Sequence, residues 1–391
     1  MKKSLVFYFG SEIFLSFGIG MSTYAQPFLY KTGHLSDASI GILFAVNSAS
    51  SGLFALVLGP VADRVGASRM FKLSTLLMGI GYLWMGLVNG FWGWLASAVL
   101  SGLAAGLLMS TENVVLSSLS KGQEKAGILS RFVSWYMLLI GLGTVTSGWV
   151  SAISSYRTAV LAGGFIALVA PLIRYFVVAN DAKSHRMFKL PSKRIVLMSL
   201  YAVLFGTAIG LFRPFATLVL NGHFGMSDEL TSAVSAATLF MISFGSLLVS
   251  PLLRRLRHGR TLLLAFVASI LFTLLMAVTG NPWLFAGALL VSTILTSVPG
   301  PIVDATFLDM TPQTDYAQMF GIRVFGSSAG SAIGAYGGGI FMSHAALRGL
   351  LTLSSGLLIV SCLYLFWLLA HVRKRRYSTV TTTVQREQFE G

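Results

Sequence analysis

Residues 194–220 read RIVLMSLYAVLFGTAIGLFRPFATLVL. Apart from Arg194 at its start, the only charged side chain in this stretch is Arg213. A helix rises about 1.5 Å per residue, so a stretch of this length can cross the ~30 Å hydrocarbon layer of a bilayer. A long apolar segment with one internal charge predicts a membrane-spanning helix.

Similar stretches occupy most of the chain on both sides of this segment. Hydrophobic residues make up 55% of the sequence, charged residues 10%, and the mean hydropathy is +0.77, whereas soluble domains carry about 25% charged residues. The other predicted spans are 5–30, 38–59, 71–90, 92–119, 131–154, 157–179, 229–252, 261–279, 282–309, 322–344 and 347–370. The predicted fold class is an all-α membrane protein with twelve transmembrane helices.

The cations of the sequence predict its orientation. Of the 28 Lys and Arg, 24 fall at the N-terminus, in the even-to-odd loops or in the C-terminal tail, while Lys31, Arg157 and Arg348 fall on the other side. Because cytoplasmic loops carry an excess of Lys and Arg, both termini are predicted to be cytoplasmic. The same pattern accounts for the net charge of +15 without a nucleic-acid partner, since the cations are not gathered on one face beside aromatic residues.

The chain divides into two similar halves. Gln26-Pro27-Phe28 matches Arg213-Pro214-Phe215, and three further pairs of short matches follow in the same order at an offset of 187 to 192 residues. These pairs are Gly33-His34 through Ser36-Asp37 with Gly222-His223 through Ser227-Asp228, Pro60…Arg64…Arg69 with Pro251…Arg255…Arg260, and Glu112…Arg131 with Asp304…Arg323. The pattern predicts an N-terminal bundle at 1–179, a cytoplasmic loop at 180–193, a C-terminal bundle at 194–370 and a basic tail at 371–391, with a central cavity between the bundles.

The loop after the second span carries a recognisable motif. It reads Gly59-Pro60-Val61-Ala62-Asp63-Arg64-Val65-Gly66-Ala67-Ser68-Arg69 and resembles the Gly-x-Leu-Ala-Asp-Arg-x-Gly-Arg-Arg loop of the major facilitator superfamily. The resemblance in layout covers the whole chain. It implies that Asp63 and Arg64 belong to a conformational latch, whose further members would be Gly59, Gly66, Arg69, Arg131 and Arg323. The alternative is that Arg64 and Arg69 only determine topology.

The motifs that mark subclasses of this family are incomplete. The Gly-Pro-x-x-Gly-Gly motif of its drug–proton antiporters is represented only by Gly143-Thr144-Val145-Thr146-Ser147-Gly148 and by Gly334-Ala335-Tyr336-Gly337-Gly338, both without proline. The central loop lacks the Pro-Glu-Ser-Pro-Arg type of motif found in sugar porters. The sequence therefore favours no single substrate.

Among the ionisable residues of the predicted spans, four stand out, because a charge costs at least about 2.5–3.5 kcal/mol at the helix centre. They are Glu12, Glu112, Arg213 and Asp304, in spans 1, 4, 7 and 10, and the family resemblance implies that these four spans line the central cavity. Desolvation disfavours the charged form of a carboxylate and a neighbouring cation favours it, so a carboxylate that alternates between such surroundings can bind and release a proton.

We therefore predict Glu12 or Glu112 as the proton-coupling residue and Arg213 as the residue that holds an anionic or hydrogen-bonding part of the substrate. Further predicted cavity residues are Gln26, Asn47, Asn113, Asp304 and Tyr136. The alternative is structural: Glu112 and Asp304 pair with Arg131 and Arg323 near the cytoplasmic surface, Glu12 meets water at the inner end of its span, and Arg213 reaches outward to the headgroups.

The predicted function is secondary active transport of a small, amphipathic organic solute by alternating access, with proton-coupled export ahead of proton-coupled uptake or lipid flipping. A membrane-embedded enzyme is the alternative of another class, but no His-Glu-x-x-His or Walker motif occurs in the sequence. We predict no cofactor and no metal. The expected partners are the solute or a lipid, protons and the bilayer of a bacterial inner membrane, and the expected state is a monomer.

Overall fold

The computed structural model describes residues 2–119, 124–178, 191–311 and 316–389, without some of the side chains in these ranges. Every regular element within them is helical. The first half contains α1 (Lys2–Thr32), α2 (Asp37–Val65), α3 (Ala67–Leu87), α4 (Phe91–Leu119), α5 (Glu124–Ile153), α6 (Tyr156–Ala167) and α7 (Val169–Arg174). The second half contains α8 (Lys193–Phe212), η1 (Arg213–Phe215), α9 (Ala216–Leu218), η2 (Val219–His223), α10 (Asp228–Arg255), α11 (His258–Val278), α12 (Pro282–Ser297), α13 (Pro299–Asp309), α14 (Tyr316–Ser343) and α15 (Leu347–Phe389).

Eleven helical segments of the described chain are long and apolar enough to cross a membrane. The predicted span 322–344 corresponds to α14, which has sufficient length at 28 residues but many Gly and Ser residues. These small residues lower its hydropathy, and they allow α14 to pack closely between α8 and α2. The predicted all-helical membrane fold with two repeated halves is confirmed.

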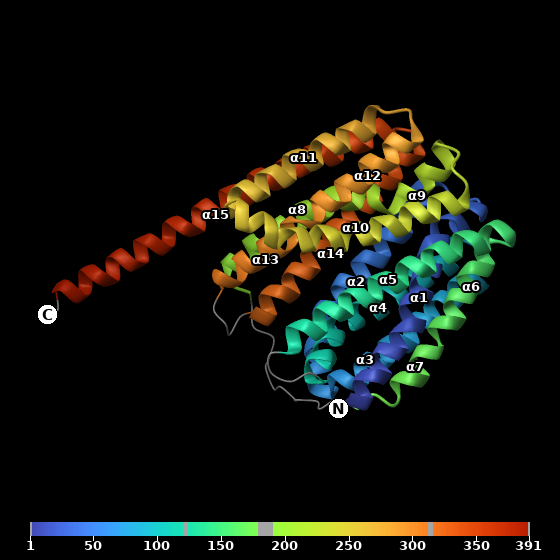
Figure 1. Cartoon of the computed structure of the whole chain (residues 1–391), viewed down its shortest axis with the longest axis horizontal. Coiled ribbons are helices and arrows are strands. Elements are labelled where there is room, and N and C mark those ends of the chain that lie inside the picture. The colour runs from blue at the N-terminus through green and yellow to red at the C-terminus, as the bar shows by residue number, and fades with distance from the viewer. Residues whose placement is uncertain (1, 120–123, 179–190, 312–315, 390–391) are drawn as a thin grey trace.

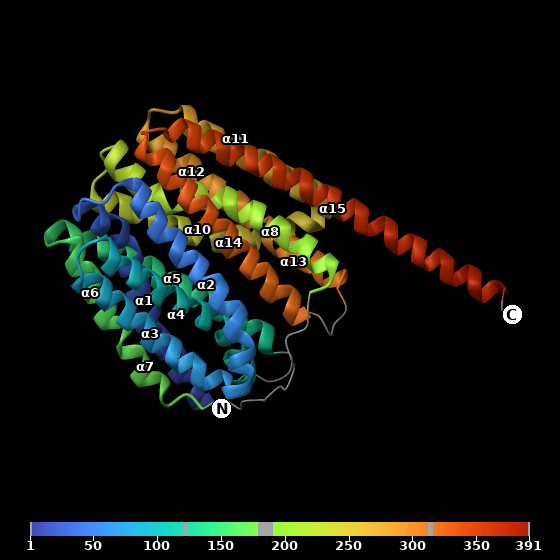
Figure 2. The same cartoon turned by 180° about the vertical axis from the view of Figure 1, so that it is seen from behind.

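Three predicted spans are divided in the structure. The segment 157–179 splits into α6 and α7 at Leu168, and 282–309 splits into α12 and α13 at Val298. The segment 194–220 is interrupted after Phe212 by the short elements η1, α9 and η2. The backbone of the predicted basic tail continues as helix α15, which projects beyond the bundle to Phe389 (Figures 1 and 2).

The internal repeat is visible in the way that α2 and α10 begin. Ser36 caps α2 by accepting a hydrogen bond from the Ser39 backbone N–H, and Ser227 caps α10 by accepting one from Leu230. In each case an aspartate, Asp37 or Asp228, follows the cap. Its negative charge stabilises the helix by interacting with the positive end of the helix dipole. The repeated Ser-Asp pair in the sequence is therefore a repeated helix start.

Two helix pairs join the halves: α2 packs against α14, and α5 packs against α10. Figures 1 and 2 show the halves side by side, with the first in blue to green and the second in yellow-green to red. We call the end of the bundle at which α2 and α10 finish, with Arg64 and Arg254, the basic end. The other end, where these two helices begin, is called the opposite end.

Glycines allow the halves to approach closely towards the opposite end. A Cβ added at Gly41 of α2 would lie 2.7 Å from the Ala335 carbonyl oxygen and 2.8 Å from the Gly339 Cα on α14. A Cβ at Gly148 of α5 would overlap Ser232 of α10. By contrast, a Cβ at Gly59, near the basic end of α2, would meet nothing within 4 Å. The closest packing between the halves is thus displaced from the basic end.

This packing predicts the effect of Gly41→Val. The added side chain has no space against α14, and overpacking a close contact costs about 1–3 kcal/mol. We expect a lower thermal unfolding midpoint of the purified protein in detergent. The control is Gly287→Val, because Gly287 is an exposed residue of α12 whose Cβ would meet nothing within 4 Å. An equal midpoint for the two variants would contradict the close α2–α14 contact.

Candidate functional site

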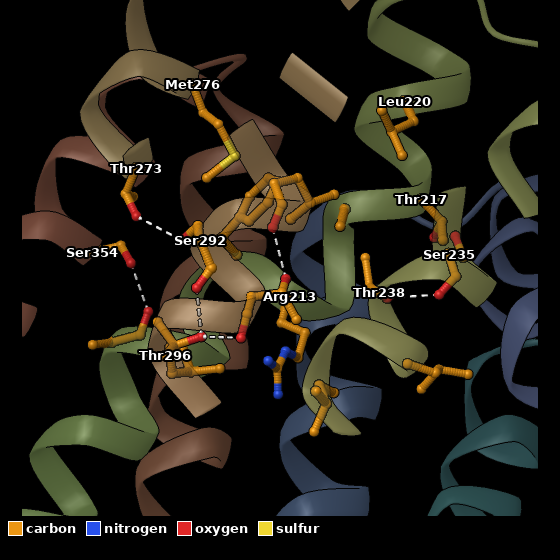
Figure 3. Close-up of a pocket in the computed structure, with 18 of the residues that line it drawn as sticks. Arg213, Thr217, Leu220, Ser235, Thr238, Thr273, Met276, Ser292, Thr296 and Ser354 are labelled. Atoms are coloured by element: carbon orange, nitrogen blue, oxygen red, sulfur yellow. Dashed lines mark hydrogen bonds between the residues drawn. The ribbon is translucent and has the colours of Figure 1, made fainter. Parts of the chain in front are cut away.

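A cavity of about 280 Å³ lies between the halves, mostly within the second (Figure 3). The first half contributes Thr23 and Tyr24 from α1 and Ile140 and Thr144 from α5. The second half contributes Ala208, Ile209, Phe212, Arg213, Ala216, Thr217, Leu220, Ser235, Thr238, Leu239, Ile242, Thr273, Met276, Leu289, Ser292, Thr293, Thr296, Ser354 and Leu358. Residues from both halves therefore line one cavity.

The break in the seventh span places Arg213 in this cavity. Pro214 has no backbone N–H to continue the ladder of α8, so the chain turns into a short 3-10 segment and then into the π-helical turn η2. Irregular backbone at membrane depth is tolerated where protein buries it or where it lines a cavity. The Arg213 side chain is exposed, and the space that it faces is the cavity.

Arg213 has no ion pair or hydrogen bond through its guanidinium among the residues that the structure describes. Figure 3 shows its nitrogens without a dashed line to any residue drawn. A guanidinium has five N–H donors in a fixed planar fork, which matches a carboxylate or phosphate. This side chain is thus available to a ligand, and its substrate-binding role stays a prediction.

The remaining polar lining of the cavity is neutral. It includes ten Ser and Thr residues, and the described lining contains no Asp, Glu, Lys or His. Eight of these hydroxyls donate to backbone carbonyls, most of them on their own helix. Examples are Thr293 to Leu289 at 2.7 Å and Thr296 to Ser292 at 2.9 Å. Sequence reasoning missed these residues, because a threonine in an apolar helix does not reveal which face it occupies.

Four other predicted cavity residues lie outside this cavity. Gln26 is buried and donates to the Tyr30 hydroxyl at 2.8 Å, while Asn47 joins α2 to α4 by donating to Ser101 at 2.8 Å and to the Ala98 carbonyl oxygen. Tyr136 packs its ring 5.3 Å from that of Phe132. Asp304 pairs with Arg323, and the side chain of Asn113 lies outside the described residues. Their substrate-binding roles stay predictions.

Glu12 lies in a closed ionic cluster with Arg174, the last residue of α7. The Arg174 Nη2 is 2.6 Å from Glu12 Oε2, and the Ser16 hydroxyl donates to Glu12 Oε1 at 2.6 Å. Arg174 also donates to Ser11 at 3.1 Å and to Thr75, so each of its three nitrogens has a partner. Both charged side chains are almost completely buried.

Arg174 is a functional candidate that sequence reasoning missed. The charge pattern groups it with the cations of the basic loops, although it lies inside the predicted span 157–179. The structure buries it completely, with its guanidinium carbon 3.9 Å from the centre of the Phe71 ring and 5.8 Å from that of Tyr8. The sequence does carry a signal for this role. Arg157 begins the span 157–179, and Arg174 is the only other charged residue within it.

Glu112 lies next to this cluster but outside it. The Tyr8 hydroxyl donates to the Glu112 backbone oxygen at 3.4 Å, and the Tyr8 ring also faces Arg174. The Glu112 side chain is half-buried. Within the described part of the chain it has no ion pair, and Arg131, its expected alternative partner, is exposed. Glu112 is therefore the less constrained of the two predicted proton-coupling residues.

The latch residues gather at the basic end. Gly66 joins α2 to α3 with φ +114°, a conformation that favours glycine, and Arg64 and Arg69 on either side are exposed. The side chain of Asp63 lies outside the described residues. In the second half, Arg323 Nη1 lies 3.0 Å from Asp304 Oδ1, so the alternative structural pairing is present for this pair. The latch function of these residues stays a prediction.

Comparisons with known proteins place the whole chain in one group. The model of the Major Facilitator Superfamily matches residues 8–193 and 198–388. A curated relative, the uncharacterized MFS-type transporter YcaD of Escherichia coli O45:K1, is 23% identical over 225 residues; the match covers 55% of this chain and 57% of the relative. The chain thus matches little more than half the length of this relative.

Solved structures share the fold at low sequence identity. A mutant form of the nucleoside transporter NupG superposes with a TM-score of 0.79 at 14% identity, covering 93% of this chain and 99% of the other. A bacterial homologue of the iron transporter ferroportin in an inward-facing state gives 0.76 at 12% identity, with coverage of 94% and 99%. A bacterial homologue of the lysosomal transporter Spinster gives 0.71 at 14%, with coverage of 95% and 98%.

The contact between Glu12 and Arg174 predicts that the stability losses of substitutions at these two residues are not additive. Arg174→Met should be strongly destabilising, by about 3–5 kcal/mol, because it leaves the Glu12 carboxylate buried without its cation. Adding Glu12→Gln to that variant should restore most of the loss, since no buried charge then remains. The measurement is a double-mutant cycle on thermal unfolding in detergent. Losses that simply add up would show that the two side chains do not interact.

Proposed function

Because this chain belongs to the major facilitator superfamily and is a transporter of the secondary type, we propose that it carries a small organic solute through the Arg213 cavity by alternating access, coupled to protons. The observation that carries this proposal is the placement of an unpaired guanidinium in a cavity lined from both halves. Solute sites of such transporters lie near the bilayer midplane between the repeats, at interrupted helices. Arg213 follows such an interruption.

Alternating access requires contacts between the halves that can break. At the opposite end, Asp228 of α10 accepts hydrogen bonds from the Tyr156 hydroxyl at 2.8 Å and from Asn221 at 2.9 Å. The Tyr24 hydroxyl donates to the Asp228 backbone oxygen at 2.7 Å. Tyr24 and Tyr156 belong to the first half and Asp228 to the second. We call these three residues the Asp228 lock, and its opening would expose the cavity at this end.

Glu112 is the proposed proton-binding residue. It is a carboxyl group inside a span, without a fixed cation in the described structure, and it borders the Glu12–Arg174 cluster through Tyr8. Glu12 is less suited to this role in the present conformation, because its charge is already compensated by Arg174 and Ser16. A group that exchanges protons must reach water in one state and lose it in another.

Orientation and direction complete the proposal. The excess of Lys and Arg at the basic end supports a cytoplasmic location for both termini in a bacterial inner membrane, and the expected direction is export of the solute. The proteins of similar fold are named for nucleosides and for iron, among others, so the fold does not define the solute. Direction and solute are therefore outcomes of the transport experiment.

The test is transport in proteoliposomes that contain a trapped pH-sensitive dye. Amphipathic anions, cations, neutral solutes and fluorescent lipids are added in turn under an imposed pH gradient. The proposal predicts proton movement that accompanies at least one small solute and that is absent from protein-free vesicles. Transport that continues at the same rate without any proton movement would disprove the coupling, and lipid movement alone would favour the flippase alternative.

We expect Glu112→Gln to affect proton-driven solute accumulation but not solute exchange. The variant keeps the size of the side chain but cannot release a proton, so solute exchange at equal pH should persist while accumulation driven by the pH gradient falls by at least about tenfold. Glu229→Gln is the matched control, because Glu229 is partly exposed in the first turn of α10. If Glu112→Gln retained full gradient-driven accumulation, Glu112 would not be the coupling residue.

We expect Tyr156→Phe to weaken the Asp228 lock, because it removes the hydroxyl that donates to the Asp228 carboxylate. A hydrogen bond to a charged group contributes about 1.5–3 kcal/mol, so its loss should shift the equilibrium towards the state open at the opposite end by about 10- to 100-fold. Spin labels at Ser154 and Gly280, both exposed at this end, measure the distance between the halves in a Cys362→Ser background. Tyr175→Phe, at an exposed residue near the basic end, is the control. Identical distance distributions for both variants would contradict the lock.

A further inference from the structure

The charge of the cavity restricts the solutes that it can hold. Arg213 supplies one positive charge, and the described lining contains no carboxylate to balance it. A cationic solute would therefore be repelled and would have no partner. A monoanion neutralises the guanidinium, whereas the second charge of a dianion such as a phosphate monoester would stay uncompensated at a low dielectric. Electrostatics thus favours a single negative charge, and the planar fork of Arg213 suits a carboxylate.

The hydroxyl groups of the lining restrict the solute further. A hydroxyl has one donor and two acceptor lone pairs. Since Thr293, Thr296, Ser235 and Thr238 give their protons to backbone carbonyls, they offer acceptors to the cavity. Figure 3 shows Ser292 and Thr296 on one side of the space and Ser235 and Thr238 on the other. Groups of the solute that contact these side chains are best matched when they donate hydrogen bonds.

Part of the apolar lining lies away from the charge. Phe212, Leu220, Met276 and Leu289 belong to one buried hydrophobic cluster of the second half, and all four line the cavity. In Figure 3, Met276 and Leu220 are on one side and the Arg213 nitrogens are on the other. The cavity of about 280 Å³ has room for roughly nine waters, and hence for a solute of about a dozen non-hydrogen atoms.

We propose that the Arg213 cavity selects small amphipathic monocarboxylates that carry a hydroxyl or amide donor. The carboxylate binds to the Arg213 guanidinium, the donor group faces the backbone-bonded hydroxyls, and the apolar body packs against Met276 and Leu220. This inference rests on the proposed function only in taking the cavity as the transport site. It adds the sign of the charge, the donor requirement and the size of the solute.

Binding to the purified full-length protein in detergent tests the inference without any transport. The probes are 4-hydroxyphenylacetate, phenylacetate and 6-hydroxyhexanoate, each beside its primary amide, together with tyramine and phenyl phosphate. The readout is the rise in thermal unfolding midpoint with probe concentration. We expect stabilisation by the hydroxylated carboxylates, weaker stabilisation by phenylacetate, and little or none by the amides, the amine or phenyl phosphate. Equal stabilisation by an acid and its amide, or none by any acid, would overturn the proposal.

Substitutions identify the residues responsible. Arg213→Gln should weaken carboxylate binding by about 10- to 100-fold, with Arg213→Lys in between, because a charge-assisted hydrogen bond is lost. Arg348→Gln is the control, because Arg348 is an exposed arginine outside the cavity. This substitution should leave carboxylate binding unchanged. Thr296→Val should weaken only the hydroxylated acids, by about 2- to 10-fold. Unchanged binding in Arg213→Gln would overturn the inference even if that variant is fully folded.

The two proposals fail separately. Carboxylates that bind through Arg213 but are not moved across vesicles would support the cavity's selectivity and contradict transport of this class. Conversely, proton-coupled movement of a cation or of a neutral solute, with no binding of any acid, would support the proposed transport function and contradict the carboxylate selectivity of the cavity. Binding that is equal in Arg213→Gln and Arg348→Gln marks a site elsewhere on the molecule.

Discussion

In hydrocarbon every backbone N–H and C=O must find a partner within the protein, and the rest of this structure depends on that constraint. It makes every regular element of the described chain helical and limits irregular backbone within the membrane to places where protein buries it or where it lines a cavity. The interruption at Arg213-Pro214 is such a place. The equivalent Pro27 of the first half lies inside the unbroken helix α1, so the two repeats use the same dipeptide position differently.

The same solvent explains how the charges are distributed. Arg174 and Glu12 are held far from water by mutual pairing, by three hydroxyl partners and by the aromatic ring of Phe71. Removing one member of such a pair costs more than the pair contributes. Arg213 differs from this pair, because its guanidinium faces the cavity instead of a carboxylate. Glu12 and Arg174 therefore compensate each other, whereas Arg213 has no partner among the described residues and can bind a ligand.

The sequence predicts correctly those features that hydropathy and composition determine. It does not predict which neighbour or cavity a side chain faces. Span positions, the repeated halves and the membrane-embedded Glu12 and Arg213 follow from hydropathy and charge, which any bilayer imposes. Arg174 was misassigned because a cation at the end of a span looks like a topology determinant until its depth is known. Polarity and position within the spans predict Gln26 and Asn47 as cavity residues, yet both side chains hydrogen-bond within the first half. A polar side chain in a span satisfies itself locally whenever a neighbour permits, and the sequence does not show that neighbour.

Tyr24 connects the cavity with the contact that closes the opposite end. It lines the cavity, and its hydroxyl donates to the Asp228 backbone oxygen across the halves. A solute can shift a conformational equilibrium only by binding its two states with different affinity. If the Asp228 lock opens as proposed, a ligand that touches Tyr24 meets a different environment in the closed and open states, because the tyrosine then loses its partner. Occupancy of the cavity and closure of this end are then not independent, which is the physical requirement for carrying a solute across without leaving an open pore.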